Sequence, residues 1–323
     1  MIGGIGMWIW ILAVICAAIV MLLLALSVAL FAVMVRRDRH PDQSEERFLR
    51  CMADSPLAGW VPKIREGTKW ISETPHEDVR ISSDDGLRLH GRLYLQPQQS
   101  GNGQLMLLSH GFHSSAPHDF SCICTEYFQM GYHLLLIDQR AHGESAGTYI
   151  CFGAKERYDV RNWCRYLAAR FPGMKVVLSG VSMGATTVLL TAALDDLPEN
   201  VAGVIADCGF TSPYDEFRHV LKNRFHLFPA PILFIAGVLC RWCAGFDIRA
   251  FDTVREVPKI RVPVLFVHGE ADTFVLSQCS RANYEACTSP KKLVLVPNAG
   301  HGMSWLVNQS KCRAVLTAFL EKL

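Results

Sequence analysis

The first 35 residues of this chain contain no Asp, Glu, Lys or Arg. From Met7 to Val35 the sequence is an uninterrupted apolar run, which as a helix would be about 43 Å long at about 1.5 Å per residue. A bilayer core requires only about 20 such residues, so we expect residues 1–35 to form a transmembrane anchor. Trp8 and Trp10 stand near one end of the run, where indole rings favour the membrane interface.

Two other interpretations of this segment fit its residues less well. A cleaved secretory signal would begin with a basic segment and end at a small-residue cleavage site, and neither feature precedes Arg36. A helix buried in a soluble core would carry a polar face. Arg36, Arg37 and Arg39 follow the apolar run and no Lys or Arg precedes it. The positive-inside tendency therefore predicts a single-pass membrane protein with its catalytic domain on the cytoplasmic side.

The rest of the chain lacks any strong excess of charge. The net charge is +2 over 323 residues, and no basic run occurs in the body of the chain, so we expect no nucleic-acid partner. The 12 cysteines are scattered, and a chain of this size does not need a disulfide framework. The C-x-x-C at Cys240 and Cys243 has no second pair and no nearby His cluster, so we expect no metal or redox site there.

The chain beyond the anchor divides into a linker and one large domain. Residues 36–76 contain four prolines and no long period, and they are expected to form a linker with a short amphipathic helix on the domain or the membrane surface. Residues 77–323 form the large domain, and from Val79 they read VRISSDDGLRLHGRLYL, an alternating pattern about an Asp-Asp-Gly turn that is typical of a β-hairpin. Short apolar runs separated by helical stretches then predict an α/β domain with buried parallel strands.

One interval in this alternation is too long for an ordinary connection. About residues 212–258 lie between the runs VIADCG and VPVLFVHG and include the apolar stretch PILFIAGVLCRWCAGF. This stretch is too short to span a membrane before Arg241. We therefore expect a helical cap insertion over the active site. A surface that dips into the membrane and an ordinary packing helix are the alternatives.

The sequence GVSMG at residues 180–184 resembles a nucleophile elbow. Ser182 follows the apolar run that ends at Leu178 and precedes the helix-forming segment ATTVLLTAAL, which is the strand, turn and helix context that the motif requires. Gly180 and Gly184 would keep side chains out of the tight turn. A G-x-S-x-G motif often occurs by chance, so the assignment of Ser182 as a nucleophile depends on whether the chain also offers a base and an acid.

A serine nucleophile needs a base, and the base needs an orienting acid. His301 is the one histidine after the last apolar run, and Asp272 lies between Ser182 and His301, just beyond VPVLFVHG. The order Ser, Asp, His is the one expected for this arrangement. Glu270 is the alternative acid, although it lies closer to the strand end. His110 and His113 precede Ser182, and His110 is expected to brace its loop.

A tetrahedral intermediate also needs amide donors. The amide of Met183, at the start of the helix after Ser182, is one expected donor. The second is expected in the loop after the first parallel strand, where Gly111 allows the backbone to direct the amide of Phe112 at the oxyanion.

Five motifs together resemble those of the α/β-hydrolase superfamily, and specifically its serine hydrolases with a helical cap. The motifs are HGF at 110–112, DQRAHGES at 138–145, GVSMG at 180–184, HGEAD at 268–272 and AGH at 299–301. The resemblance covers residues 77–323. It implies a mostly parallel eight-stranded sheet with helices on both faces, no cofactor and no metal, and acyl transfer to water through an acyl-serine.

By match to these motifs, the resemblance implies that Ser182 is the nucleophile, His301 the base and Asp272 its partner. Ala141 stands where the motif more often has Gly, a difference that concerns turn geometry. The function expected is a membrane-anchored serine hydrolase acting on a small-molecule or lipid ester or a thioester. A peptidase of the prolyl-oligopeptidase type is an alternative, but residues 36–76 are too few for its propeller. A non-catalytic membrane binding module is a third.

Overall fold

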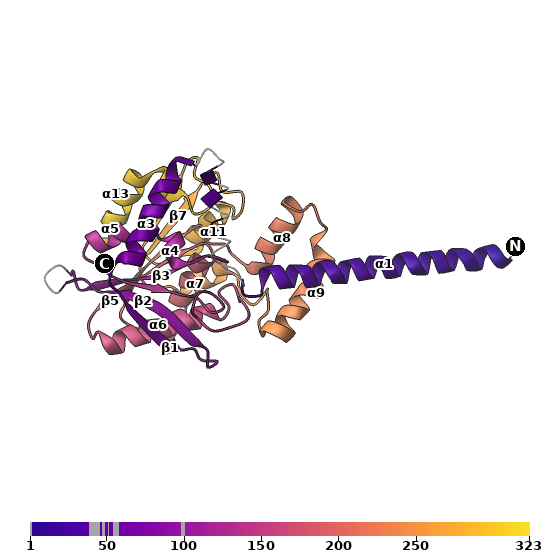
Figure 1. The fold of residues 1–323 in the computed structure, drawn as a ribbon, viewed down its shortest axis with the longest axis horizontal. Helices are drawn as coiled ribbons and strands as arrows, with labels where there is room; N and C mark the ends of the chain where they lie inside the picture. The colour runs from indigo at the N-terminus through magenta and orange to yellow at the C-terminus, as the bar shows by residue number, and fades with distance from the viewer. Residues whose placement is uncertain (1, 39–45, 47–48, 51, 54–57, 98–100) are drawn as a thin grey trace.

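The computed structural model describes residues 2–38, 46, 49–50, 52–53, 58–97 and 101–323. Eight strands form one sheet in the order β1-β2-β4-β3-β5-β6-β7-β8 (Figure 1). β1 pairs antiparallel with β2 and β2 antiparallel with β4, and the remaining pairs are parallel. The expected hairpin and mostly parallel eight-stranded sheet are thus confirmed. The strands are β1 (Glu77–Ser82), β2 (Arg88–Tyr94), β3 (Gln104–Ser109), β4 (His133–Ile137), β5 (Lys175–Val181), β6 (Val201–Asp207), β7 (Val264–Gly269) and β8 (Lys291–Val296).

The central strands are apolar at nearly every position because both faces of the sheet are covered. In β3, Met106 and Leu108 join the buried cluster on one face, and Leu105 and Leu107 join the cluster on the other. This alternation follows from the two-residue repeat of a strand. The continuous apolar runs in the sequence therefore belong to strands that are buried on both sides.

Two helical layers cover the sheet. We call the side with the C-terminal helix the α13 face and the opposite side the α6 face. The α13 face is covered by α3 (Val61–Glu73), α4 (Ala116–Asp119), α5 (Cys124–Gln129), α12 (Ser304–Val307) and α13 (Gln309–Leu320). The α6 face is covered by α6 (Glu156–Arg170), α7 (Met183–Ala192), α10 (Thr253–Glu256), the 3₁₀ turn η3 (Val257–Lys259) and α11 (Gln278–Ala286).

Helix α3, which follows the short 3₁₀ turn η1 (Ala58–Trp60), lies on the body of the domain. Its apolar side, with Val61, Ile64 and Ile71, is buried in the cluster of the α13 face. Lys63 Nζ donates to Gln309 Oε1 at 2.5 Å, which ties α3 to α13. Most of the linker expected before this helix lies outside the described residues.

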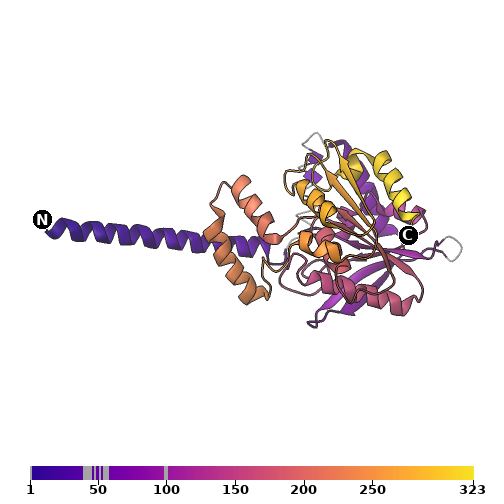
Figure 2. The same ribbon diagram turned by 180° about the vertical axis from the view of Figure 1, so that it is seen from behind.

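Helix α1 (Ile2–Met34) extends away from the sheet, and the cap lies beside its C-terminal half (Figures 1 and 2). The cap, as the term is used below, comprises α8 (Pro213–Asn223), α9 (Pro229–Leu239), the π-helical turn η2 (Cys240–Ala244) and the loop between α8 and α9. It is inserted between β6 and β7. Met7–Met34 is long and apolar enough to cross a membrane.

Candidate active site

Ser182 forms the turn that joins β5 to α7. Its backbone has φ 55° and ψ −119°, a conformation that residues with a side chain rarely adopt. A Cβ at Gly180 would lie 2.3 Å from the Gly184 carbonyl oxygen, and a Cβ at Gly184 would lie 1.9 Å from that of Ser109. Close backbone packing therefore requires both glycines, and the strained turn presents the Ser182 hydroxyl at the carboxyl end of the sheet.

The structure brings Ser182, His301 and Asp272 into one hydrogen-bonded chain. His301 Nε2 lies 2.9 Å from Ser182 Oγ, and His301 Nδ1 lies 2.7 Å from Asp272 Oδ2. Ser182 comes from the turn after β5, Asp272 from the loop after β7 and His301 from the loop after β8. These parallel strands lie in the order β5-β6-β7-β8, so their carboxyl ends meet at one edge of the sheet. With Nδ1–H donating to Asp272, Nε2 can accept the hydroxyl proton of Ser182.

The Asp272 carboxylate is held in place by several donors. Its Oδ1 accepts from the backbone amides of Phe274 at 2.9 Å and Val275 at 3.0 Å. Burial by itself would raise the pKa of Asp272, but hydrogen bonds from His268 and His301 outweigh it and hold the pKa well below its usual range. Asp272 is therefore ionised and able to orient the imidazole ring.

His268, which closes β7, is a site residue that the sequence analysis did not single out. Its fully buried ring places Nε2 3.2 Å from Asp272 Oδ2 and 2.9 Å from the Val275 carbonyl oxygen, and Nδ1 lies 2.7 Å from Ser280 Oγ. The His-Gly end of the run VPVLFVHG is the signal that could have identified it. Glu270, the alternative acid, is exposed and pairs instead with Arg281 at 3.1 Å.

Two backbone amides near Ser182 in the fold are candidates for an oxyanion hole. Met183 is the first residue of α7, where amides have no acceptor within the helix. Phe112 lies in the loop after β3, and within the described part of the chain its amide has no hydrogen-bond acceptor. Both amides are thus available to a ligand oxygen.

The loop that carries Phe112 is braced from both sides. The Gly111 amide donates to Asp119 Oδ2 at 2.6 Å, and Ser114 Oγ donates to Asp119 Oδ1 at 2.6 Å. His110 Nδ1 bonds the Gly111 carbonyl oxygen at 2.7 Å, and its Nε2 accepts from the Gln139 amide at 3.1 Å. Both ring nitrogens of His110 are therefore used by the backbone, as its expected bracing role requires.

The charged motif at 138–145 supports the turn after β4 through partners outside the motif. Arg140 donates to Asp159 at 2.6 and 2.7 Å and to Asp85 at 2.8 and 3.1 Å. Asp138 Oδ2 lies 2.7 Å from His90 Nδ1. Ala141 has φ 60°, a left-handed conformation that glycine adopts without strain. The substitution of Ala for Gly at this position thus concerns backbone geometry.

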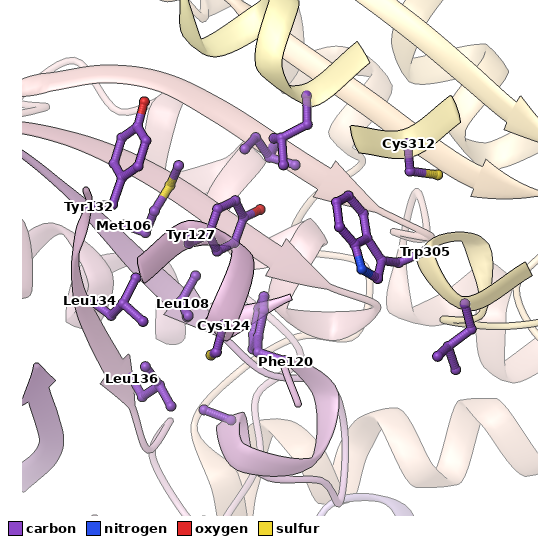
Figure 3. Close-up of a cluster of buried hydrophobic side chains, with 14 of the residues drawn as sticks. Met106, Leu108, Phe120, Cys124, Tyr127, Tyr132, Leu134, Leu136, Trp305 and Cys312 are labelled. Atoms are coloured by element: carbon purple, nitrogen blue, oxygen red, sulfur yellow. The ribbon is translucent and has the colours of Figure 1, made fainter. Parts of the chain in front are cut away.

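A cavity of about 550 Å³ opens beside Ser182 on the α13 face. Residues of both β2 and β7 line the cavity, and these strands lie on opposite sides of β5 in the sheet. The cavity therefore has two arms that extend from Ser182 in different directions. The arm toward β2 is polar and is lined by Arg92, Asp138 and Glu144. The arm beneath α3, α12 and α13 is mainly apolar, and its lining includes Ile64, Leu265, Trp305, Leu306 and Leu316. Figure 3 shows the Trp305 indole between Tyr127 and Cys312.

The apolar arm also contains polar atoms with weak or no partners. Among the described residues, Trp305 Nε1 is buried without a hydrogen-bond partner. Asp207, at the end of β6, accepts one side-chain bond, from Ser304 Oγ at 3.5 Å. Burial raises the pKa of Asp207 to about 6. The sequence analysis did not single out Asp207, although it closes the apolar run of β6.

Cys208 lies near the candidate triad, whereas Cys240 and Cys243 belong to the cap. The Cys208 thiol lies within 4.8 Å of Asp272 and His301, but burial raises its pKa well above the usual value, and the other two groups already bond each other. Cys240 is buried whereas Cys243 is exposed. The C-x-x-C therefore divides between two environments.

Comparisons with known proteins agree with this geometry. The family described as serine aminopeptidase, S33, matches residues 102–228. The uncharacterized protein YqkD of Bacillus subtilis is 28% identical over 198 residues, which cover 61% of this chain and 65% of that protein. Protein bem46 of Schizosaccharomyces pombe is 24% identical over 220 residues, covering 67% of each chain. The chain thus spans about two thirds of the lengths of these relatives.

Solved structures share the fold. The esterase Pf2001 of Pyrococcus furiosus superposes with a TM-score of 0.61 at 22% identity, covering 79% of this chain and 94% of that one. The eight-stranded sheet, the elbow after β5 and these matches lead to one conclusion: the chain has the α/β-hydrolase fold.

Proposed function

We propose that this protein is a membrane-anchored serine hydrolase that cleaves carboxylic esters through an acyl-serine intermediate. The observation that carries the proposal is the chain of hydrogen bonds from Ser182 Oγ through His301 to Asp272, at 2.9 and 2.7 Å. A hydroxyl, a neutral imidazole and an ionised carboxylate in this order are the groups that nucleophilic acyl transfer requires.

In the proposed reaction, His301 Nε2 takes the proton of Ser182 as the hydroxyl oxygen attacks the ester carbonyl. The amides of Phe112 and Met183 hold the resulting oxyanion. His301 then gives its proton to the leaving alcohol, and the acyl-serine remains. Water enters, loses a proton to His301 and attacks the acyl carbon, which releases the acid and restores Ser182.

The two arms of the cavity support an amphiphilic ester as the substrate. The arm beneath α3 and α13 is mainly apolar and suits an acyl chain, whereas the arm near Arg92, Asp138 and Glu144 is polar and suits the alcohol part. A lipid ester or a thioester with an apolar acyl group meets both requirements.

Retention of α1 as an anchor is supported by its packing. Phe31 and Val35 are buried against the cap and body, and Arg37 Nη1 donates to the Ser145 carbonyl oxygen at 2.6 Å. Removal of this segment would expose the apolar surface that it covers. The arginines after α1 support a cytoplasmic domain. External protease cleavage of the domain on intact cells would contradict that orientation.

An aminopeptidase is the second candidate, because the matching family is described in those words. The same triad would attack an amide in place of an ester. Amino-acid p-nitroanilides turned over faster than p-nitrophenyl esters would favour this reading over esterase activity.

The deciding experiment compares Ser182→Ala with Ser109→Ala in the full chain. Ser109 is buried near the site, and within the described residues its Oγ has no hydrogen-bond partner, so it provides a matched control. We expect Ser182→Ala to reduce turnover of p-nitrophenyl butyrate by about 10⁴-fold or more and to prevent labelling by a fluorophosphonate. Ser109→Ala should retain both. Unchanged hydrolysis by Ser182→Ala, or a wild-type protein that no fluorophosphonate labels, would refute the proposal.

A further inference from the structure

The apolar run of α1 is longer than a bilayer requires, and its last turns have another partner. About 20 residues span the hydrocarbon core, which accounts for the run from Met7 to about Leu26. Beyond that point, Phe31 and Val35 are buried in a cluster with cap residues. The C-terminal turns of α1 therefore pack on the cap, and the membrane-spanning part ends close to it.

Cap helix α9 lies beside this part of α1 (Figures 1 and 2). Its sequence, PAPILFIAGVL, contains no charged residue. Ile232, Leu233 and Ala236 are buried on the side that faces the cluster. On the other side of the helix, Ala230 and Phe234 are exposed, and 70% of the Phe234 surface is accessible.

Exposed aromatic residues are concentrated on the cap. Outside α1, six large hydrophobic side chains in the described part of the chain are exposed, and four of them belong to the cap. These four are Phe225 (58% exposed), Phe228 (77%), Phe234 (70%) and Trp242 (86%). Exposed Lys222 and Arg224 stand next to Phe225. Aromatic rings flanked by basic side chains are typical of surfaces that bind the headgroup region of a bilayer.

The C-terminal end of α1 is also close to the candidate active site. His113 Nε2 lies 3.2 Å from the Arg36 carbonyl oxygen, and the His113 ring stacks on Phe112 at 3.9 Å. The Phe152 ring contacts Phe112 at 5.3 Å and Phe217 of the cap at 4.8 Å. One layer of aromatic rings thus separates the loop of the oxyanion hole from the cap.

We infer that the cap docks into the lipid bilayer beside α1, with Phe225, Phe228, Phe234 and Trp242 in the interface. The bilayer is favoured over another protein because the cap packs on the C-terminal part of α1, the helix that is long and apolar enough to cross the membrane. One consequence rests on the proposed function: an ester dissolved in the bilayer reaches Ser182 beneath the cap without crossing bulk water.

Tryptophan quenching tests the docking without any assay of activity. The full chain is reconstituted in phosphatidylcholine and phosphatidylglycerol vesicles that contain a lipid brominated near the glycerol end of its chains. The difference between wild type and Trp242→Phe isolates the Trp242 emission, and that between wild type and Trp70→Phe isolates an indole of α3 on the body. We expect strong quenching of Trp242 and little of Trp70. Equal quenching of the two indoles, or cross-linking that places the aromatic patch against a second copy, would overturn the inference.

A kinetic measurement tests the consequence. Phe228→Ser combined with Phe234→Ser changes only exposed rings, so the fold is kept. We expect turnover of a long-chain ester dissolved in the vesicles to fall about tenfold, because membrane binding scales with buried apolar area, while turnover of water-soluble p-nitrophenyl butyrate stays within about twofold. Equal loss with both esters would overturn the kinetic consequence. Quenching of Trp242 in a protein that hydrolyses no ester would refute the proposed function and leave the docking intact.

Discussion

The two faces of the sheet are covered by helices of similar number but are filled differently. On the α6 face, Trp163 and its neighbours in α6 and α7 are fully buried against the strands. On the α13 face, a cavity separates the strands from α3 and α13. Protein interiors are normally close-packed, so a hollow of about 550 Å³ costs stability. The difference indicates that the α13 face is shaped for a ligand.

Buried polar groups follow the same division. On the α6 face, Asp159 is paired with Arg140 at 2.6 Å. On the α13 face and among the described residues, half-buried Asp207 accepts a side-chain hydrogen bond from Ser304 alone, at 3.5 Å, and buried Trp305 Nε1 has no partner. Unpaired buried polar groups cost about 1–3 kcal/mol each. Their presence beside the nucleophile is the kind of local cost that functional sites carry.

The largest expected effect concerns the two tryptophans. Trp163→Ala should lower the free energy of unfolding by about 3–5 kcal/mol, because it leaves a void in a packed layer. Trp305→Ala should cost at least about 1 kcal/mol less, because Trp305 already borders a cavity and its indole N–H is unpaired. Urea unfolding of the detergent-solubilised full chain, followed by far-UV circular dichroism, measures both. Equal losses would contradict a difference in packing.

The second prediction concerns the pH dependence of stability. Burial raises the pKa of Asp207 from 3.8 to about 6, so the folded state binds the proton more tightly than the unfolded state. The resulting stabilisation is fully present below pH 3.8 and is lost as the pH rises through about 6. Between pH 4 and pH 8, wild type should lose about 2 kcal/mol more than Asp207→Asn.

The comparison variant is Asp159→Asn on the α6 face, where burial also raises the pKa of Asp159 to about 6 although Arg140 is its partner. This change leaves the buried Arg140 guanidinium without its charged partner, so it should destabilise the fold at both pH values. Denaturant unfolding at pH 4 and pH 8 gives the comparison. A wild-type pH dependence that persists unchanged in Asp207→Asn would assign it to other groups.

The smallest expected effect comes from adding volume to each face. Leu316→Phe on α13 enters the cavity and should cost less than about 1 kcal/mol, whereas Leu189→Phe on α7 overpacks a filled layer and should cost about 1–3 kcal/mol. Leu316→Phe should also lower kcat/KM for a dodecanoyl ester about tenfold relative to a butyryl ester. An unchanged chain-length ratio would mean that the acyl group lies elsewhere.

Much of the fold was predictable because the strands are buried on both faces. A strand of this kind is apolar throughout, so each run stood out against the helices, and the polar residues that follow the runs marked one edge of the sheet. Ser182, Asp272 and His301 were found in this way, and the structure brings them together. Phe112 and Met183 were inferred from the same positions.

Other features depend on contacts between distant segments. Asp119 supports the site through a bond to the Gly111 amide that no local pattern indicates, whereas the His-Gly end of β7 could have pointed to His268. The interval of 212–258 was expected to cover the active site, and the alternative of a membrane-dipping surface was also considered. The exposed aromatic rings of the cap and its packing on α1 favour a cap that both covers the active site and contacts the membrane.

The sequence alone determined the order of strands and helices, the apolar anchor and the residue types of the candidate triad, because each depends on local periodicity or on a short motif. The tertiary structure alone decided which face of the sheet is hollow, that Asp207 lies half-buried without an ion-pair partner among the described residues, and that the cap lies beside α1. These features arise where segments far apart in the chain pack together, and packing depends on the shapes of both partners.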